Sequence, residues 1–359
     1  MNRALNFNAG PAALPEAVLK EAEKNWLNFN GSGMAVMELS HRSKEYQTVH
    51  DKAISLLRKL LTISDDFEVL FIQGGASLQF SMVPMNLLEE GQTAQYVLSG
   101  SWSEKALKEA NKIGSTLIAG SSKDQKYRFI PEYNADIQSN AAYLHITSNN
   151  TIYGTQWHSF PSNEKNPLIA DMSSDILSRP LDINNFDLIY AGAQKNLGPS
   201  GVTVVIIRKD LLNKSPENLP AMLNYNTYAS NNSLYNTPPT LAIYLLSLVL
   251  EWAEEEGGLQ QIQKMNEKKA KALYDVIDES EGFYLGHAHQ DSRSLMNVTF
   301  NLHSEEASKD FLQQAKEAGF VGLGGHRSIG GCRASIYNAV PPEHVHKLAE
   351  FMTTFKNKY

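Results

Sequence analysis

A lysine and an aspartate each follow an apolar run in this sequence, and together they indicate covalent amine chemistry. The run at residues 188–191 leads through small residues to Lys195, and the run at residues 168–170 ends on Asp171. Such positions lie at the edge of a packed interior rather than on a solvated face. A lysine there can form a Schiff base with pyridoxal 5′-phosphate (PLP), and an aspartate can hold the protonated pyridine nitrogen of that cofactor. These residues alone leave a second interpretation equally open, a strand-end lysine in a surface salt bridge.

Other candidate side chains follow predicted strands or begin predicted helices. Ala76 and Ser77 close a glycine-rich turn between a strand and a helix, where a helix N-terminus attracts phosphate. Trp102 begins a helix, and an aromatic ring there can stack on a flat heterocycle. Thr151 and Gln194 also follow strands. Because ligands of open parallel sheets bind at the carboxyl edge, this convergence favours a ligand site. The alternatives are that Ser77 is a helix N-cap and that Trp102 is a core residue.

Two His-Arg pairs stand out in an acidic chain. His41 and Arg42 form one pair, and His326 and Arg327 form the other. The guanidinium fork suits carboxylate or phosphate, and the adjacent histidine adds a donor. Arg333, a few positions further on, could bind a second anion. The pattern predicts a substrate with a carboxylate at one end and a phosphate or second carboxylate at the other. The alternative is that the arginines are exposed and bind no ligand.

Composition narrows the class of protein. The chain has 359 residues, of which 42% are hydrophobic and 20% charged, enough for two domains with a large core. A net charge of -7 gives no reason to expect a nucleic-acid or membrane partner. The single cysteine, Cys332, excludes a disulfide within the chain and fits a reducing cytoplasm, and we expect it to be buried filler. We expect no signal peptide, no membrane span and no metal site.

Helix and strand patterns alternate from about residue 15 to residue 209, beginning with a helix predicted at residues 18–29. This alternation predicts an α/β layer with a mostly parallel sheet covered by helices. Two long helices follow, at residues 239–256 and 259–281, and later segments include a strand at residues 333–338. The second part therefore indicates a smaller α+β domain. We predict a large cofactor-binding domain at residues 15–258, and a small domain at residues 259–359 that includes the N-terminal segment 1–14.

The chain resembles, nearly end to end, the phosphoserine aminotransferase family, class-V members of the fold-type-I PLP-dependent transferases. The similar blocks are FNAGPA (7–12), MELSHRS (37–43), GGAS (74–77), GAQKN (192–196), NTPPT (236–240) and RASIYN (333–338). The GGAS block is loosely specific. The HR pair at residue 41, the QKN block and the late HR pair are highly specific in combination.

The resemblance implies a role for each residue that would bind PLP. Lys195 would bond the cofactor, Asp171 would hold its pyridine nitrogen, Trp102 would stack on its ring and Thr151 would contact its phenolic oxygen. The cofactor phosphate would be bound by five residues, the last two from the neighbouring subunit of a homodimer: Ala76, Ser77, Gln194, Asn236 and Thr237.

The implied activity is amino transfer between L-glutamate and 3-phosphohydroxypyruvate, which gives 2-oxoglutarate and O-phospho-L-serine in serine biosynthesis. His41, Arg42, His326 and Arg327 would bind the substrate phosphate or distal carboxylate, and Arg333 would bind the α-carboxylate. Some relatives also aminate the longer phosphorylated keto acid that leads to 4-phosphohydroxythreonine in pyridoxine biosynthesis. The sequence leaves that second activity open.

The chain departs from the family pattern at two positions. Gly324 replaces an expected lysine and Cys332 an expected methionine, which could change how anions are held in that loop. Two kinds of alternative function stay open. The chain could be another fold-type-I enzyme, such as a serine–glyoxylate transaminase or a cysteine desulfurase, for which Cys332 is the one candidate nucleophile. It could also be a non-catalytic protein that binds a phosphorylated metabolite.

Overall fold

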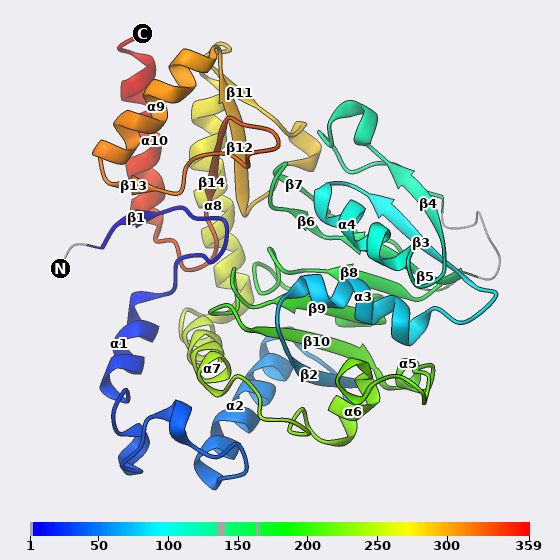
Figure 1. The fold of residues 1–359 in the computed structure, drawn as a ribbon. Helices are drawn as coiled ribbons and strands as arrows, with labels where there is room; N and C mark the ends of the chain where they lie inside the picture. Colours follow the sequence, from blue (N-terminus) through cyan, green and yellow to red (C-terminus); the bar gives the residue numbers. More distant parts are fainter. Residues whose placement is uncertain (1–2, 135–140, 163, 165) are drawn as a thin grey trace.

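A seven-stranded sheet forms the centre of this computed structural model, which describes residues 3–134, 141–162, 164 and 166–359. The strand order is β2-β10-β9-β8-β5-β3-β4. Strand β10 (Val202–Arg208) is antiparallel to both of its neighbours, whereas the other pairings are parallel. This arrangement confirms the predicted α/β fold with a mainly parallel sheet (Figure 1). It also brings the carboxyl ends of β5, β8 and β9 side by side.

The remaining elements are bounded as follows. The strands are β1 (Leu5–Asn6), β2 (Phe67–Gln73), β3 (Thr93–Leu98), β4 (Ser115–Ser121), β5 (Ala141–Thr147), β6 (Asn149–Asn150), β7 (Thr155–Gln156), β8 (Leu168–Asp171), β9 (Leu188–Gly192), β11 (Tyr284–Gly286), β12 (Asn297–Leu302), β13 (Phe320–Val321) and β14 (Cys332–Ser335). The α-helices are α1 (Glu16–Lys24), α2 (Lys44–Leu61), α3 (Ala76–Leu87), α4 (Ser101–Ala110), α5 (Lys209–Leu212), α6 (Tyr225–Ser230), α7 (Thr240–Glu255), α8 (Gly258–Asp278), α9 (Glu305–Glu317) and α10 (Pro342–Lys356).

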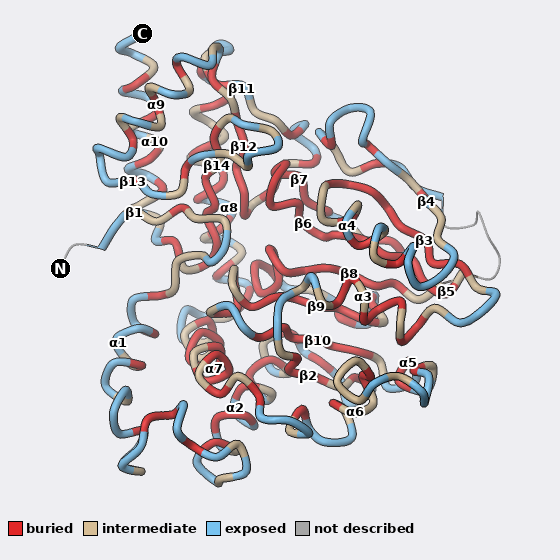
Figure 2. The backbone as a smooth tube through the Cα atoms, viewed as in Figure 1, coloured by how far each residue is buried: buried red, intermediate tan, exposed pale blue. Residues whose placement is uncertain are grey.

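Both faces of the large sheet are covered by helices. Along β2, Val69 and Phe71 pack into a core shared with α1, α2 and α7, whereas Leu70 and Ile72 pack into a second core shared with α3, α4 and α6. Successive strand side chains point to opposite faces, so near-continuous apolar strands are expected when both faces are buried. Figure 2 shows the resulting buried strands between partly exposed helices.

A third core lies in the C-terminal part of the chain. The antiparallel strands β11, β12 and β14 pack with α8, α9 and α10 around residues such as Phe300 and Phe311. Phe7, from the N-terminal segment, joins this core, and β1 pairs with β13 in parallel. Within the described ranges, none of the helices combines the length and apolar character needed to cross a bilayer.

Two predicted elements end earlier than the apolar pattern indicated. Helix α1 stops at Lys24 instead of continuing to residue 29, because Asn25 caps it and its side chain bonds Glu21 O at 3.2 Å. Asn and Gly residues then favour turns, and Asn30 lies in the left-handed region at φ 48°. Strand β14 stops at Ser335 rather than residue 338, and residues 336–340 form a turn instead.

Candidate active site

A pocket opens at the carboxyl edge of the sheet, where β5, β8 and β9 end side by side. Six of the sequence-predicted residues line it: Ala76, Ser77, Trp102, Asp171, Gln194 and Lys195. They come from the first turns of α3 and α4 and from the ends of two neighbouring strands. The topology therefore gathers residues that are up to 119 positions apart in the sequence, from Ala76 to Lys195, as open parallel sheets do.

Lys195 lies in the turn that follows β9 and is only partly exposed. Its Nζ donates to Thr151 Oγ1 at 2.6 Å. The N-terminal segment covers the lysine stem closely, since a Cβ on Gly10 would lie 3.3 Å from Lys195 Cγ. The pKa of Lys195 is lowered to about 8, mainly by burial, with the charge of Asp171 opposing the shift and that of Arg333 adding to it. A larger fraction of this amine is therefore neutral near physiological pH than for an exposed lysine.

Asp171 ends β8 and is 6% exposed. Its Oδ1 accepts the Ser173 amide at 2.9 Å and the Ser173 hydroxyl at 2.6 Å. The Ser173 hydroxyl also accepts the Gly192 amide at 3.1 Å, which ties the ends of β8 and β9 together. Burial raises the pKa of Asp171, whereas the Ser173 hydrogen bonds and the charge of Lys195 act in the opposite direction. Ser173 thus holds one carboxylate oxygen, and no hydrogen bond within the described residues engages Oδ2, which remains for a ligand.

The N-terminus of α3 has the form of an anion site. Gly75 is its N-cap, and no side chain caps the helix, so the prediction that Ser77 is the N-cap is wrong. Gly192 allows the close approach of β9, since a Cβ there would lie 3.2 Å from the Ala76 amide nitrogen. Uncapped amides and the helix dipole favour a bound phosphate at this end.

Trp102 lies at the start of α4, partly buried at the pocket wall rather than inside a core. Lys195 Nζ lies 5.8 Å from its ring centroid. Its indole Nε1 is buried without a hydrogen-bond partner in the described part of the chain. An unsatisfied donor at a pocket wall is expected where a ligand completes the site.

The anion-binding candidates divide into two groups. Arg333 Nη1 donates to the Thr151 carbonyl at 3.0 Å, so Arg333 lies beside the threonine that contacts Lys195. Burial, and after it the charge of Arg333, lower the pKa of His326. His41 Nδ1 instead lies 3.2 Å from Thr237 Oγ1. These residues are not part of the pocket lining described above.

The remaining predicted residues are exposed. They are Arg42, Asn236, Thr237 and Arg327. None of these four has a hydrogen bond or ion pair to Lys195 or Asp171 among the contacts of the described residues. The structure of one chain therefore brings together the PLP-binding candidates other than Asn236 and Thr237, and leaves these four residues at the surface.

Sequence reasoning missed several residues that shape the pocket. Ser173 holds Asp171, Gly10 lies against Lys195 and Asn196 bonds the 336–340 turn through Asn338 at 3.1 Å. Ser173 stands only two positions after the strand end, so its place in a tight turn was a usable signal. The other two contacts join segments far apart in the sequence, and no local pattern indicates them.

Comparison with known proteins decides the family. The model of the class-V aminotransferases matches residues 4–348. The chain belongs to this family. It is 64% identical over 361 residues to the phosphoserine aminotransferase of Geobacillus kaustophilus (strain HTA426), with 100% of both chains covered. It is 60% identical over 358 residues to that of Bacillus subtilis (strain 168), covering 100% of this chain and 99% of the relative.

Solved structures of phosphoserine aminotransferases have the same fold. The enzyme from Bacillus circulans subsp. alkalophilus superposes with a TM-score of 0.97 at 57% identity, over 99% of each chain. A PLP-bound enzyme from Trichomonas vaginalis gives 0.93 at 37% identity, covering 98% of this chain and 100% of that one. This chain is thus a PLP-dependent transaminase of the phosphoserine aminotransferase group, and the resemblance inferred from the motifs is confirmed.

Proposed function

We propose that this chain transfers the amino group between L-glutamate and 3-phosphohydroxypyruvate, in serine biosynthesis, with Lys195 as its reactive amine. The observation that carries the proposal is the pairing of Lys195 and Asp171 across one pocket, with the pKa of the amine lowered to about 8. Names of relatives at 56–64% identity support the choice of substrates.

The residues of the pocket fit PLP. Lys195 would bond its aldehyde, Oδ2 of Asp171 would accept from its ring nitrogen, and the free indole of Trp102 faces the same pocket. The uncapped amides of Ala76 and Ser77 would hold its phosphate together with Gln194. When bound, the cofactor supplies an aldehyde that captures amines and a ring that accepts electrons from the substrate α-carbon.

The chain's own residues would transfer the proton and stabilise the charge that this chemistry requires. Once the substrate amine has displaced it from the cofactor aldehyde, the neutral Lys195 Nζ would take a proton from the substrate α-carbon and deliver it to the former aldehyde carbon of the cofactor. Thr151 Oγ1, 2.6 Å from Nζ, orients the amine. A carboxylate at Asp171 would keep a proton on the ring nitrogen, and the two Ser173 hydrogen bonds favour that carboxylate by stabilising its charged form.

Substrate anions require the arginines. Arg333 Nη1 is bound to the Thr151 carbonyl, which fixes the guanidinium beside Lys195 so that its remaining N–H groups can bind an α-carboxylate. His326, Arg327, His41 and Arg42 would bind the phosphate of one substrate or the γ-carboxylate of the other. Both anions present oxygens in the forked geometry that guanidinium recognises.

The proposal includes a cytoplasmic homodimer in which each subunit completes the site of its partner. Asn236 and Thr237 are exposed, and Thr237 holds His41, so all of these residues would reach the same neighbouring site with Arg42. The preceding segment exposes apolar side chains at Trp26 (47%), Leu27 (82%), Met34 (42%) and Met37 (45%). Exposed apolar groups of this kind favour an interface between subunits.

A cysteine desulfurase is disfavoured by the only cysteine. Cys332 is fully buried, and burial raises the pKa of its thiol to about 12. Such a thiol is neither mobile nor ionised near neutral pH, so it cannot act as the nucleophile.

The deciding experiment is a transamination assay with O-phosphoserine and 2-oxoglutarate. The purified chain should convert the pair, and O-phosphoserine alone should bleach the visible absorbance of the bound cofactor. Lys195→Ala should lose both this absorbance and turnover. Near wild-type turnover by that variant would show that another amine does the chemistry. A colourless wild-type protein that binds phosphoserine without turnover would support the binding-only alternative.

A further inference from the structure

A second buried lysine lies outside the pocket, on helix α8. Lys269 is 1% exposed, and its Nζ donates to three backbone carbonyls: Ile336 at 2.9 Å, Tyr337 at 2.7 Å and Val340 at 3.2 Å. No carboxylate pairs with it among the described residues. Burial lowers the pKa of Lys269 to about 7. Burying an ammonium group is costly unless its donors are satisfied. The three carbonyls that accept from Lys269 Nζ therefore fix the shape of the turn at residues 336–340.

The turn bound by Lys269 reaches Lys195 along two arms. In the first arm, the Tyr337 hydroxyl donates to the Ala9 carbonyl at 2.7 Å, which holds Gly10 against the Lys195 stem. In the second arm, the backbone amide of Asn338 donates to Asn196 Oδ1 at 3.1 Å, and Asn196 directly follows Lys195 in the chain. One arm covers the reactive lysine and the other holds its backbone.

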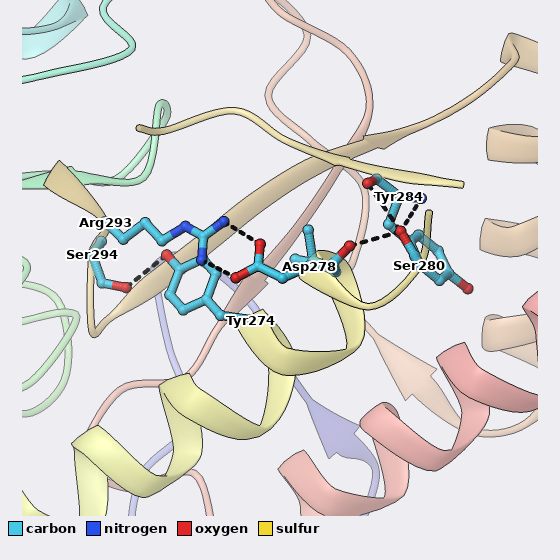
Figure 3. A network of polar contacts seen from close by, with 7 residues as sticks. Tyr274, Asp278, Ser280, Tyr284, Arg293 and Ser294 are labelled. Atoms are coloured by element: carbon cyan, nitrogen blue, oxygen red, sulfur yellow. Dashed lines mark hydrogen bonds and ion pairs between the residues drawn. The ribbon is translucent and has the colours of Figure 1, made fainter. Parts of the chain in front are cut away.

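Helix α8 provides a fixed base for these arms. One turn before Lys269, the Asn266 side chain donates to the Ser178 carbonyl at 3.0 Å and to Asn338 Oδ1 at 2.8 Å. Near its C-terminus the helix is held by a second network, shown in Figure 3, in which Tyr274 donates to the Ser294 carbonyl at 2.9 Å and Arg293 pairs with Asp278. The helix is thus tied both to the loop after β8 and to the small sheet.

We propose that Lys269 is a positioning residue, which holds the 336–340 turn so that its two arms keep Lys195 seated and shielded from water. The inference deepens the proposed function and rests on it for its catalytic meaning. The hydrogen bonds on which it is built all lie within this one chain. Burial is the largest cause of the low pKa of Lys195, so the proposal makes that pKa depend on a side chain that never touches the pocket.

The test measures the Lys195 amine directly in the full-length, cofactor-free protein. Competitive acetylation over a range of pH, followed by mass spectrometry of the peptide that contains Lys195, gives the midpoint of its titration. Lys269→Met removes all three donors and should raise that midpoint by about one pH unit or more, because a loosened cover admits water. The matched control is Leu273→Ala on the same helix, a fully buried core residue. It should lower the melting temperature and leave the Lys195 midpoint unchanged.

A milder variant keeps the proposal testable if Lys269→Met does not fold. Tyr337→Phe removes the hydroxyl that holds Ala9 and should raise the Lys195 midpoint in the same direction, by a smaller amount. An unchanged midpoint in both folded variants, or in Tyr337→Phe alone if Lys269→Met does not fold, would overturn the proposal. An equal shift in Leu273→Ala would also overturn it, since the effect would then reflect general loosening. Because cofactor is absent from the assay, its result is separate from whether Lys195 is the cofactor-bonding residue.

Discussion

At the scale of single residues, the protonation state of Lys195 depends on two opposing influences on its pKa. Burial and Arg333 favour its neutral form, and Asp171 favours its charged form, with burial the larger effect. The neutral amine is the nucleophile. A site built to hold a cofactor aldehyde therefore gains by keeping water from this lysine, and the backbone of Gly10 packs against the lysine stem.

The lowered pKa of Lys195 predicts how cofactor uptake depends on pH. Because its pKa falls from 10.5 to about 8, the amine becomes neutral as pH rises through about 8. The rate at which cofactor-free protein binds PLP should rise with pH and level off above this value. Stopped-flow absorbance measures it. A rate that keeps rising to about pH 10, as expected for an exposed lysine, would contradict this assignment.

Replacing the substrate-binding arginines should weaken the use of substrate and leave the affinity for the cofactor nearly unchanged. Arg42→Ala and Arg327→Ala should each weaken the use of O-phosphoserine by at least about 2 kcal/mol in kcat/KM, because a charge-assisted contact is lost. PLP affinity, measured by spectral titration, should change little. An equal loss of PLP affinity would indicate a structural role for the arginine instead.

Some of these residues could be predicted from sequence and others could not. Lys195 and Asp171 could be predicted because each follows an apolar strand, and Arg333 because it closely follows a His-Arg pair that stands out in an acidic chain. Gly10 and Lys269 were not, since their partners lie more than sixty positions away in the sequence. The roles of Asn236, Thr237, His41 and Arg42 at a shared site stay predictions.

At the scale of elements, apolar runs located the strands well. The expected end of β8 at Asp171 matches the structure, because a strand buried on both faces is apolar throughout. The end of α1 was missed, since it depends on the Asn25 side chain rather than on apolar spacing. The order of strands in the sheet was also beyond the local pattern, because pairing joins distant segments.

The packing of β9 against α3 predicts the effect of one methyl group. In Gly192→Ala the added Cβ would lie 3.2 Å from the Ala76 nitrogen, so the first turn of α3 must shift. We expect PLP affinity to fall by about 1–3 kcal/mol, the usual range for overpacking, because the phosphate-binding amides move. Isothermal titration of the cofactor measures this. The melting temperature of the cofactor-free variant is the control, and a fall in stability with unchanged PLP affinity would refute the prediction.

At the scale of the whole molecule, the proposed sharing of sites between subunits predicts complementation. Lys195→Ala and Arg42→Ala proteins should each be inactive or nearly so. After unfolding and refolding together, half of randomly paired dimers are hybrids with one intact site, so about a quarter of wild-type activity should return. If no activity returns although hybrids form, each site is complete within one chain. The division into two domains at residue 258 likewise stays a prediction, which limited proteolysis can examine.

Lys195 is the residue that we expect to bond the cofactor. Borohydride reduction of the purified full-length protein fixes bound PLP to its lysine, and peptide mass spectrometry then locates the added mass. We expect one modified lysine per chain, at Lys195. A modification on any other lysine, or none in a protein that still transaminates, would contradict it.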